Sequence, residues 1–443
     1  MANTYLYRTP GSAGNRGIWT VSCWVKKSNP TKRTVLFGTP GSDNNSTSNF
    51  IFHQDSGVRW GVNSFNVFTT TSTFLMRDPA SWYHLVLSIN TSEGSSDNRT
   101  KFYINGERFT DFDGNNLNSV SNSFQYGWNN TILHTICKDP APSGTDYFSG
   151  YITNFVNIDG QALAPSSFGE TDSTTGEWKP KADLSGLTFG TNGCWLKFEN
   201  EGNLGADSSG NGNNWTVSGA GTNAKTADTA NNSFATFNSI APTYASGSTS
   251  LVLSEGNLKT VMSNGGNGMR RSSLAAANGK WYAEFKVTST AAANSDDFGI
   301  GVVPADNYET GRVAGDHTGG VVYLHTGQKR TDASGYQSYG NSYTTGDIIS
   351  VALDMDNGQV FFYKNGTIQD SGTAAATGLS GAYVMMTQVN DATSGSHTVE
   401  VNFGNPTFTI ASGNADANGF GNFEYAVPSG YYALCTKNIN SYG

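Results

Sequence analysis

The chain has 443 residues, a formal net charge of −9 at pH 7 and only 14% charged residues. This length predicts two or three domains, each able to bury its own core. The acidic balance, with no Lys/Arg run longer than two, argues against a nucleic-acid partner, which would require a basic face. The 53 glycines, 20 tyrosines and 25 phenylalanines are typical of β-sheets joined by many turns.

Apolar runs and cysteines set further limits. No apolar run approaches ~18 residues, so we expect no membrane insertion, and the N-terminus lacks the pattern of an ordinary secretion signal. The cysteines show no CxxC spacing, so neither a zinc site nor a disulfide-dense scaffold is expected. Cys23 and Cys194 lie inside apolar stretches, where a reduced and buried thiol is expected.

The first predicted strands are residues 17–27 and 81–90, and both alternate in hydrophobicity. In the second of them His84 and Ser88 are predicted to face solvent, while the residues predicted to face inward are Tyr83, Leu85, Leu87 and Ile89. Helical periodicity is nearly absent along the chain, and no heptad or β-helical repeat predicts a fibrous shaft.

Two similar stretches, KFYINGERF (101–109) and VFFYKNGTI (360–368), each run from a strand into an Asn-Gly pair. A third Asn-Gly pair is found at 357–358. Asn-Gly between alternating apolar runs predicts a type I′ hairpin turn, in which both central residues have positive φ. The recurring order of strand, turn, strand and Asn-Gly turn predicts two β-sandwich domains of similar topology.

The domain boundary is expected in residues 219–250, which are small, polar and without period. We assign residues 1–230 to the first domain, residues 231–250 to a linker and residues 251–443 to the second domain. Residues 280–287 (KWYAEFKV) begin the regular strands of the second domain.

The core strands of both halves resemble known families. WTVSCWVKK, SWYHLVLSI, KFYINGERF and DYFSGYITNFVNIDGQAL resemble laminin-G-like, concanavalin A-like jelly rolls. GKWYAEFKV, FGIGVV, GDIISVALDMDNGQVFFYKNG and VEVNFG resemble a SPRY domain. The resemblance implies an all-β fold with two concanavalin-type or jelly-roll β-sandwich domains in tandem.

The combination of the two domains, with the stretch DSSGNGNNWTV and the ending PSGYYALCTKNI, is similar to two-domain structural proteins of marine tailed bacteriophages. This resemblance implies a virion protein on the particle surface, either a capsid decoration or a tail-associated module. The partners it implies are other virion proteins and host-surface or environmental polysaccharide, and copies in a symmetric array would form a homo-oligomer. It does not decide between head and tail.

Calcium is the cofactor that the resemblance raises, because laminin-G-like sandwiches often hold it in an oxygen-rich loop. Two loops offer alternating oxygen ligands, and the candidate residues are Asp111, Asp113 and Asn115 in one loop, and Asp207, Asn211 and Asn213 in the other. The alternative is that these side chains cap turns through their own backbone. No other cofactor is expected.

Glycan recognition would require exposed aromatic rings beside amide and hydroxyl groups. The candidates in polar, turn-rich stretches are Trp60, Trp128, Tyr336 and Tyr343. The alternative is that these rings belong to the cores, as expected for Tyr339. In SPRY domains the loops at one end of the sandwich hold partners, and here that end would include residues 303–320 and 338–344.

Catalytic carboxylates would be expected on one strand face if the chain were a glycoside hydrolase. The nearest pairs are Glu199 with Glu201 and Asp354 with Asp356, and Asp356 precedes an Asn-Gly turn that it is expected to stabilise. We therefore expect no enzymatic activity. Two alternatives to the virion hypothesis stay open: a polysaccharide-degrading enzyme on the same scaffold, and a SPRY-type peptide-binding adaptor.

Overall fold

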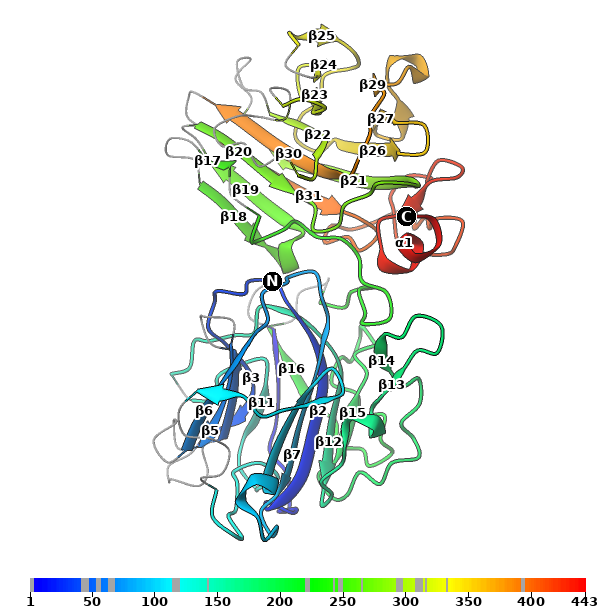
Figure 1. Ribbon diagram of the computed structural model, residues 1–443. Coiled ribbons are helices and arrows are strands. Elements are labelled where there is room, and N and C mark those ends of the chain that lie inside the picture. Colours follow the sequence, from blue (N-terminus) through cyan, green and yellow to red (C-terminus); the bar gives the residue numbers. More distant parts are fainter. Residues whose placement is uncertain are drawn as a thin grey trace. The chain divides into compact units, whose positions relative to one another are not determined.

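The computed structural model describes residues 4–40, 48–52, 57–62, 68–113, 120–141, 143–219, 224–241, 244–245, 250–263, 266–291, 298–306, 314, 317–331, 334–391 and 395–443. Nearly all of the regular structure is β, which confirms the predicted fold class. The chain forms two compact units (Figure 1). The first comprises Met1–Lys225 and Thr229–Asn231, and the second comprises Thr226–Asp228 and Asn232–Gly443.

The first unit has two antiparallel sheets and a separate hairpin. One sheet has the strand order β10 (Phe112–Asp113), β6 (Phe68–Leu75), β5 (Gly57–Val62), β4 (Ser48–Phe52), β3 (Thr34–Thr39), β11 (His134–Ile136), β1 (Tyr5–Arg8) and β16 (Thr216–Ser218). The other has the order β15 (Cys194–Leu196), β12 (Gly150–Asp159), β2 (Ile18–Lys27), β7 (Tyr83–Asn90), β8 (Thr100–Ile104) and β9 (Glu107–Phe109). The hairpin is β13 (Gly169–Thr171) with β14 (Trp178–Pro180), and short 3₁₀ turns are η2 (Ser96–Asn98) and η4 (Pro165–Ser167).

The second unit is built in the same way. One sheet has the order β17 (Tyr244–Ala245), β20 (Gly266–Arg271), β30 (Tyr383–Asp391), β22 (Gly299–Pro304), β23 (Val321–Leu324), β24 (Gln328–Thr331) and β25 (Gln337–Ser338). The other has the order β18 (Ser250–Ser254), β19 (Lys259–Ser263), β31 (Ser396–Asn402), β21 (Lys280–Ser289), β26 (Ile348–Asp354), β27 (Gln359–Lys364) and β28 (Thr367–Ile368). Also present are β29 (Ala376–Thr377) beside β27, β32 (Tyr432–Ala433) parallel to β21, the 3₁₀ turns η5 (Glu255–Asn257) and η7 (Asp370–Gly372), and the helix α1 (Thr436–Tyr442).

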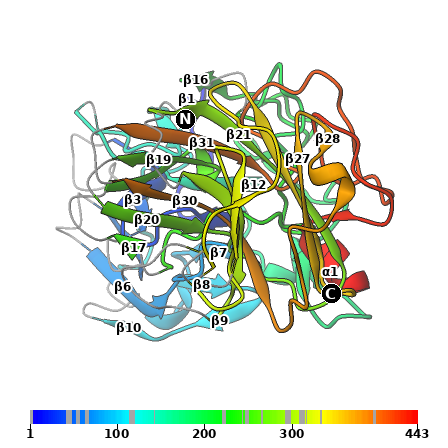
Figure 2. The same ribbon diagram turned by 90° about the horizontal axis from the view of Figure 1, so that it is seen from above.

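Each unit is a β-sandwich with a core between its two sheets. Alternate residues of β2, namely Trp19, Val21, Cys23 and Val25, enter the first core. Alternate residues of β26, namely Ile349, Val351 and Leu353, enter the second core. Figure 2, seen from above, shows β19 and β31 side by side, as their pairing requires. The period-two pattern of these strands therefore corresponds to the residues that enter the core between the two sheets, although both faces of β2 and β26 are buried.

The outer face of the β7 sheet is also covered, which corrects one prediction. His84 and Ser88 are 0% and 3% exposed, so the prediction that they face solvent is wrong. The chain after β12 folds back over this face, and Phe168, Leu184 and Phe189 pack there. An alternating pattern shows that a strand has two kinds of face, but not whether a distant segment covers the polar one.

The Asn-Gly turns divide into two kinds. Asn105–Gly106 and Asn365–Gly366 each have two positive φ values, 49° and 89° in the first and 46° and 77° in the second, which confirms the predicted type I′ geometry. Gly358 has a φ of 62°. Asn357 is not among the positive-φ residues, and four residues separate the paired ends of β26 and β27. The prediction of a type I′ turn at 357–358 is therefore wrong, since that geometry requires a two-residue loop.

The unit boundary differs from the predicted linker at 231–250. The second unit already includes residue 232, and Phe234, Ala235 and Phe237 are 3%, 0% and 0% exposed. Ala235 and Phe237 belong to the second core. The start of this segment is part of the second sandwich because Phe234, Ala235 and Phe237 are buried there, although its composition resembles that of a linker.

Two smaller predictions concern cysteines and membrane spans. Cys23, Cys137, Cys194 and Cys435 are all buried and free, which confirms the expectation for Cys23 and Cys194. Burial raises the pKa of the Cys137 and Cys194 thiols to about 12, so both are protonated at neutral pH. Among the described residues, no helix is long and apolar enough to cross a membrane.

Candidate binding surface

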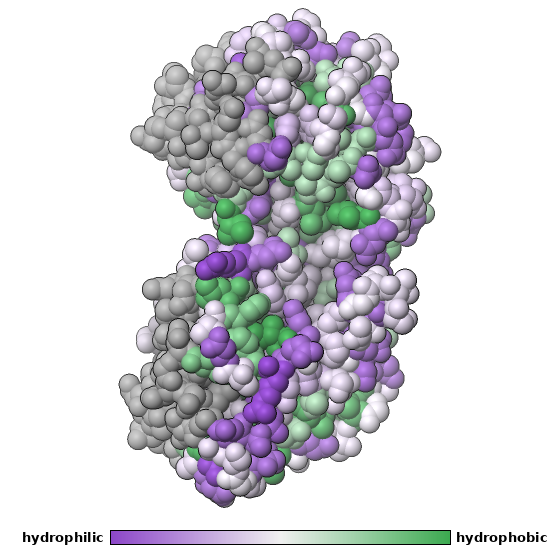
Figure 3. Space-filling view, viewed as in Figure 1, coloured by the Kyte–Doolittle hydropathy of each residue, from purple (hydrophilic) through white to green (hydrophobic). Residues whose placement is uncertain are grey.

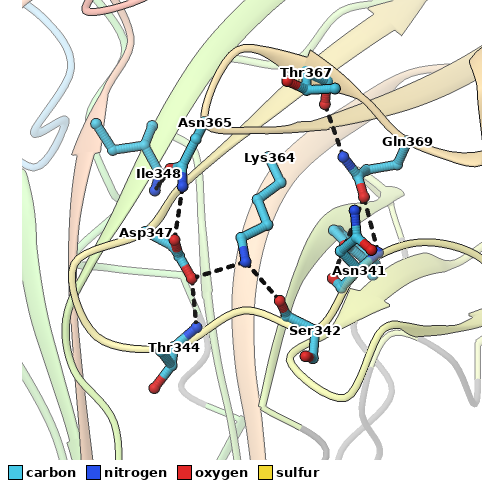
Figure 4. Close-up of polar contacts among 10 residues, drawn as sticks. Asn341, Ser342, Thr344, Asp347, Ile348, Lys364, Asn365, Thr367 and Gln369 are labelled. Carbon is cyan, nitrogen blue, oxygen red and sulfur yellow. Dashed lines mark hydrogen bonds and ion pairs between the residues drawn. The ribbon is translucent and has the colours of Figure 1, made fainter.

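The best-defined candidate surface lies at one end of the second sandwich. β26 begins at Ile348 and β27 ends at Lys364, and Ile349 pairs with Lys364. The loop before β26 and the turn after β27 therefore meet at the same end of the sheet, as Figure 4 shows. We call residues 341–347 and 364–369 the loop-end surface.

An ion pair fixes the middle of the loop-end surface. The Lys364 Nζ lies 3.2 Å from the Asp347 Oδ2 and donates to the main-chain oxygen of Ser342 at 2.7 Å. The same Asp347 carboxylate accepts the Thr344 N–H at 2.8 Å and the Asn365 Nδ2 at 2.7 Å. Burial by itself raises the pKa of Asp347, but these donors outweigh it and hold the pKa below its usual value. Asp347 is therefore charged at neutral pH and ties the loop to the turn.

A buried amide fixes the rest of the surface. Gln369 is 3% exposed. Its Oε1 accepts the Asn341 N–H at 2.9 Å, and its Nε2 donates to the Thr367 main-chain oxygen at 2.8 Å. A Cβ atom at Gly340 would lie 2.7 Å from that Oε1, so only glycine permits this approach without displacement. The two segments are thus joined by side chain to backbone bonds at both ends.

The exposed groups of this surface are mostly neutral hydrogen-bonding groups. The exposed residues with amide or hydroxyl side chains are Asn341, Ser342, Thr344, Thr345, Asn365 and Thr367. Ile368 adds an apolar side chain that is 37% exposed. A surface of this kind can offer hydrogen bonds and one apolar anchor to a protein or to a glycan.

The two loops predicted to share one end of the SPRY-like sandwich lie at opposite ends. Residues 303–320 join the end of β22 to the start of β23. The chain then crosses the sheet along β23, and the Tyr343 N–H donates to the His325 oxygen just beyond its far end. Residues 338–344 therefore lie at the other end, and that prediction is wrong. Residues 307–313 and 315–316 lie outside the described residues.

Three of the four rings predicted to contact glycan are buried. Trp60, Trp128 and Tyr343 are 3%, 0% and 3% exposed, so the prediction that they offer exposed faces is wrong. Polar residues and glycines flank these rings in the sequence, whereas the rings themselves belong to the cores. Tyr336 is 55% exposed, with the Arg330 guanidinium 5.0 Å from its ring centroid, and contact with glycan there stays a prediction. Tyr339, at 5% exposed, lies in the core as expected.

The candidate calcium ligands of the later loop bind the chain itself. The Asp207 carboxylate accepts the N–H groups of Trp195, Ser209 and Asn213 at 2.8–2.9 Å, and the Ser209 hydroxyl at 2.8 Å. The Asn211 Nδ2 donates to the Gly190 oxygen at 2.8 Å. These contacts are those of the turn-capping alternative. Calcium at this loop stays a prediction.

The earlier calcium loop is described only in part. Asp111 is exposed, and its main-chain oxygen accepts the Thr73 N–H at 3.1 Å. The Asp113 side chain and the whole of Asn115 lie outside the described residues. Calcium binding by these three residues therefore also stays a prediction.

The two carboxylate pairs take part in local contacts. The Asp354 Oδ2 lies 2.8 Å from the Lys280 Nζ, and the Asp356 Oδ1 accepts the Gly279 N–H at 2.7 Å. Burial by itself raises the pKa of Asp354, but the bonds from Lys280 and Asn357 lower it overall. Glu199 and Glu201 are exposed. The expectation that the chain is not an enzyme stays a prediction.

A buried serine–histidine pair in the first unit was not found from the sequence. The His84 Nε2 lies 2.8 Å from the Ser22 hydroxyl, and its Nδ1 lies 2.9 Å from the Trp178 Nε1. An indole N–H can only donate, so Nδ1 is the acceptor and the proton of neutral His84 is on Nε2. Burial lowers the pKa of His84 to about 3. The nitrogen facing Ser22 is therefore a donor, and it cannot act as a general base toward that hydroxyl.

Comparisons with known proteins identify two domains. Residues 2–167 match the family model of the concanavalin A-like lectin/glucanases superfamily, and residues 280–404 match that of the SPRY domain. The chain therefore contains a concanavalin A-like domain followed by a SPRY domain, which confirms the domain composition expected from the resemblance. No curated protein matches the chain.

Solved structures similar to parts of the chain include two SPRY domains and a pentraxin. The SPRY domain of human HERC1 is 19% identical, with 34% of this chain and 91% of that chain covered and a TM-score of 0.29. A second human SPRY domain is 16% identical, with 34% and 93% covered and a TM-score of 0.27. The heptameric SAP-like pentraxin from Limulus polyphemus is 16% identical, with 37% and 72% covered and a TM-score of 0.28.

The two domains together indicate a protein-binding or adhesion module. Both are β-sandwiches, in which strands provide a rigid frame and loops carry the contacts. Fold alone does not define the partner, because these sandwiches host many functions.

Proposed function

We propose that the chain is a non-enzymatic attachment protein that binds other proteins through the loop-end surface of its SPRY domain. The observation that supports this is the fixation of that surface by the Asp347–Lys364 ion pair and by the Gln369 amide. A surface already held in one conformation loses little entropy when a partner binds. Its neutral hydrogen-bonding groups and the exposed Ile368 provide the contacts.

We further propose that the chain acts on the surface of a tailed-phage particle, as a capsid-decorating or tail-associated module. The support is the resemblance of both domains, of the stretch DSSGNGNNWTV and of the ending PSGYYALCTKNI to two-domain virion proteins. Its partners in this proposal are other virion proteins.

Mass spectrometry of purified particles tests the location. The expected result is a stoichiometric copy number of this chain in the particle. Absence from particles that are otherwise complete would exclude the virion proposal. A pull-down from host lysate that retains one specific soluble protein, and no particle component, would favour the adaptor alternative instead.

Binding of the purified full chain to particles that lack it tests the surface. Ile368→Asp is expected to weaken this binding at least about tenfold, because it places a charge at the apolar anchor (tenfold is about 1.4 kcal/mol). The matched control is Ile240→Asp, which changes an isoleucine that is 50% exposed in the same unit but outside the loop-end surface. Equal binding by both variants would contradict the proposal.

Adhesion to polysaccharide, on the host surface or in the environment, is the second part of the attachment proposal. Tyr336 supports it because its ring is 55% exposed beside a guanidinium, and sugars pack on exposed rings. Tyr336→Ala is expected to reduce retention on a polysaccharide column, whereas Tyr336→Phe keeps the ring and should retain it. Equal loss or equal retention by both variants would exclude ring contact.

A further inference from the structure

The second unit has a sheet edge, formed by β18, that is not part of the loop-end surface. β18 (Ser250–Ser254) ends its sheet among the described residues, with β19 on its other side, and Figure 1 shows it outermost. Its sequence, SLVLS, reads the same in both directions about Val252. We propose that β18 pairs antiparallel with β18 of a second copy of this chain, across a two-fold axis at Val252.

The ladder register shows which backbone groups face outward. The Val401 N–H donates to the Leu258 oxygen at 2.7 Å, so residues 258, 260 and 262 bond toward β31. In an antiparallel ladder the bonding direction alternates, so residues 259, 261 and 263 bond toward β18. These face residues 254, 252 and 250. The backbone groups of Leu251 and Leu253 therefore point away from the sheet, to the outer edge.

The outward groups are available for pairing. Within the described residues, the N–H groups of Leu251 and Leu253 and the oxygen of Leu253 make no hydrogen bond at this edge. The Leu251 oxygen accepts the Arg270 Nη2 at 2.5 Å. A carbonyl oxygen has two lone pairs, so this oxygen can accept a second donor. The edge thus offers two donors and two acceptors in a row.

The side chains fit a second copy because the strand is palindromic. Antiparallel pairing about Val252 places Leu251 opposite Leu253 of the second copy, and Ser250 opposite Ser254 of the second copy. A two-fold interface requires this self-complementarity, since each residue meets the symmetry-related patch. The strand contains no charged residue, whereas sheet edges that must stay single usually carry Lys or Pro. No like-charge pair would therefore oppose the contact.

Burial of the side chains agrees with this arrangement. Val252 is 53% exposed, and Leu251 and Leu253 are partly buried against the second core. Figure 3 shows hydrophobic surface in this region of the second unit. Pairing would place the two Val252 side chains next to each other on one face of the sheet. On the other face, Leu251 and Leu253 would contact the leucines of the second copy. β28, at the far edge of the same sheet, carries part of the loop-end surface, so this inference is independent of the proposed function.

Sedimentation equilibrium of the full chain over a range of concentrations tests the proposal. The expected result is a monomer–dimer equilibrium, with Val252→Lys or Val252→Glu each reducing the association constant at least tenfold through like charges at the axis. A mixture of the two variants should recover association. The matched control is Thr377→Lys, at an exposed position of β29 beside β27, which should leave the equilibrium unchanged. A monomer at all concentrations, a dimer insensitive to Val252→Lys, or no recovery in the mixture would overturn the proposal.

Cross-linking gives a second measurement that does not depend on weakened association. At the axis the two Val252 residues form a pair without mutual hydrogen bonds, with Cα atoms about 4.5 Å apart, which is within the range for a disulfide. The native cysteines are all buried, so Val252→Cys supplies the reactive thiol. Oxidation should give a covalent dimer of Val252→Cys and not of Thr377→Cys. Equal cross-linking of both variants, or none in Val252→Cys, would contradict the two-fold pairing.

Discussion

The two Asn-Gly hairpins have the same backbone but different surroundings. The Asn105 Oδ1 accepts the His84 N–H at 2.8 Å, and the Asn365 Oδ1 accepts the Ile348 N–H at 2.9 Å. Each asparagine N–H also donates to the oxygen of the same neighbouring residue at 2.9 Å. The asparagine thus serves the same purpose in both units: it forms the turn and satisfies the first residues of the adjacent strand.

The surroundings differ in chemistry. In the first unit the Trp178 ring lies against Gly106, and its indole N–H donates to His84. The turn is therefore next to the buried His84 side chain. In the second unit Tyr425 covers Gly366, while the Asp347–Lys364 ion pair holds an exposed loop beside the turn. The same turn therefore lies beside a buried polar group in one unit and within a candidate binding surface in the other.

The largest expected effect comes from removing the covering rings. Trp178→Ala should destabilise the first unit by about 3 kcal/mol, since it removes a large packed ring and leaves the His84 Nδ1 without its donor. Tyr425→Ala should cost the second unit less, about 1–2 kcal/mol. Hydrogen-exchange mass spectrometry of the full chain measures both units separately. Equal losses would show that the two covers are equivalent after all.

The next largest effect is expected in the pH dependence of stability, which should be stronger for the first unit. Burial lowers the pKa of His84 to about 3 and that of His134 to about 4. Between these values and about 6.5, the unfolded first unit binds more protons than the folded one, so its stability is complete above about pH 6.5 and falls as the pH decreases. Each histidine contributes at most about 1.4 kcal/mol per pH unit.

Urea unfolding at pH 7.5, 6 and 5 measures this dependence through tryptophan fluorescence. Trp281 is the one tryptophan of the second unit, so the other eight report on the first. His84→Gln has no group to titrate and should show a smaller decrease between pH 6.5 and 5. An unchanged slope in this variant would contradict the lowered pKa.

Substituting the turn glycines sharpens the comparison of the two backbones. A Cβ at Gly106 would lie 3.1 Å from the Trp178 ring, and one at Gly366 would lie 2.6 Å from the Tyr425 ring. Both alanine variants should lose about 1–2 kcal/mol through positive φ alone, and Gly366→Ala should lose more because of the closer contact. Chemical denaturation followed by hydrogen exchange measures each loss.

Gly346→Ala is the matched control for these glycine variants, because Gly346 has a φ of 96° and no atom within 4 Å of a built Cβ. It should show the backbone cost alone. A loss as large as that of Gly366→Ala would mean that the ring contact contributes nothing.

The smallest effect is expected from Asp347→Asn. It removes the ion pair with Lys364 and should cost the second unit about 1 kcal/mol, with faster hydrogen exchange in residues 341–347. Because the pKa of Asp347 is lowered, its contribution is present above about pH 4 and is lost as the pH falls below that value. Asp306→Asn, at an exposed position, is the control. Unchanged exchange would show that the ion pair does not hold the loop.

Some of this structure could be predicted from the sequence. The alternation in β2 and β7 and the Asn-Gly pairs at 105–106 and 365–366 identified strands, the inward face of β7 and two type I′ turns, because these depend on local backbone geometry. Trp60 and Trp128 were misjudged for the opposite reason. Their sequence neighbours are polar, and only the packing of the sheets shows that the rings point inward.

For the candidate site, the sequence predicted one of the two segments that form it but not their contact with each other. Residues 338–344 were expected to bear contacts, but the pairing with residues 364–369 joins segments more than twenty residues apart through Gln369 and Lys364. The prediction that residues 303–320 lie at the same end as residues 338–344 was wrong. Each strand crosses the sheet from one end to the other, so the end at which a loop lies depends on the number of strands between the two loops.

The sequence by itself determined that this protein is built from β-strands in two sandwiches with tight Asn-Gly turns, since side-chain alternation and positive φ are properties of a few adjacent residues. Tertiary structure alone decided that both faces of the sheet containing β7 are covered and where the second unit begins. It also decided that His84 is a buried, neutral hydrogen-bond donor. These depend on contacts between segments far apart in the chain, whose formation is governed by total burial and not by local pattern.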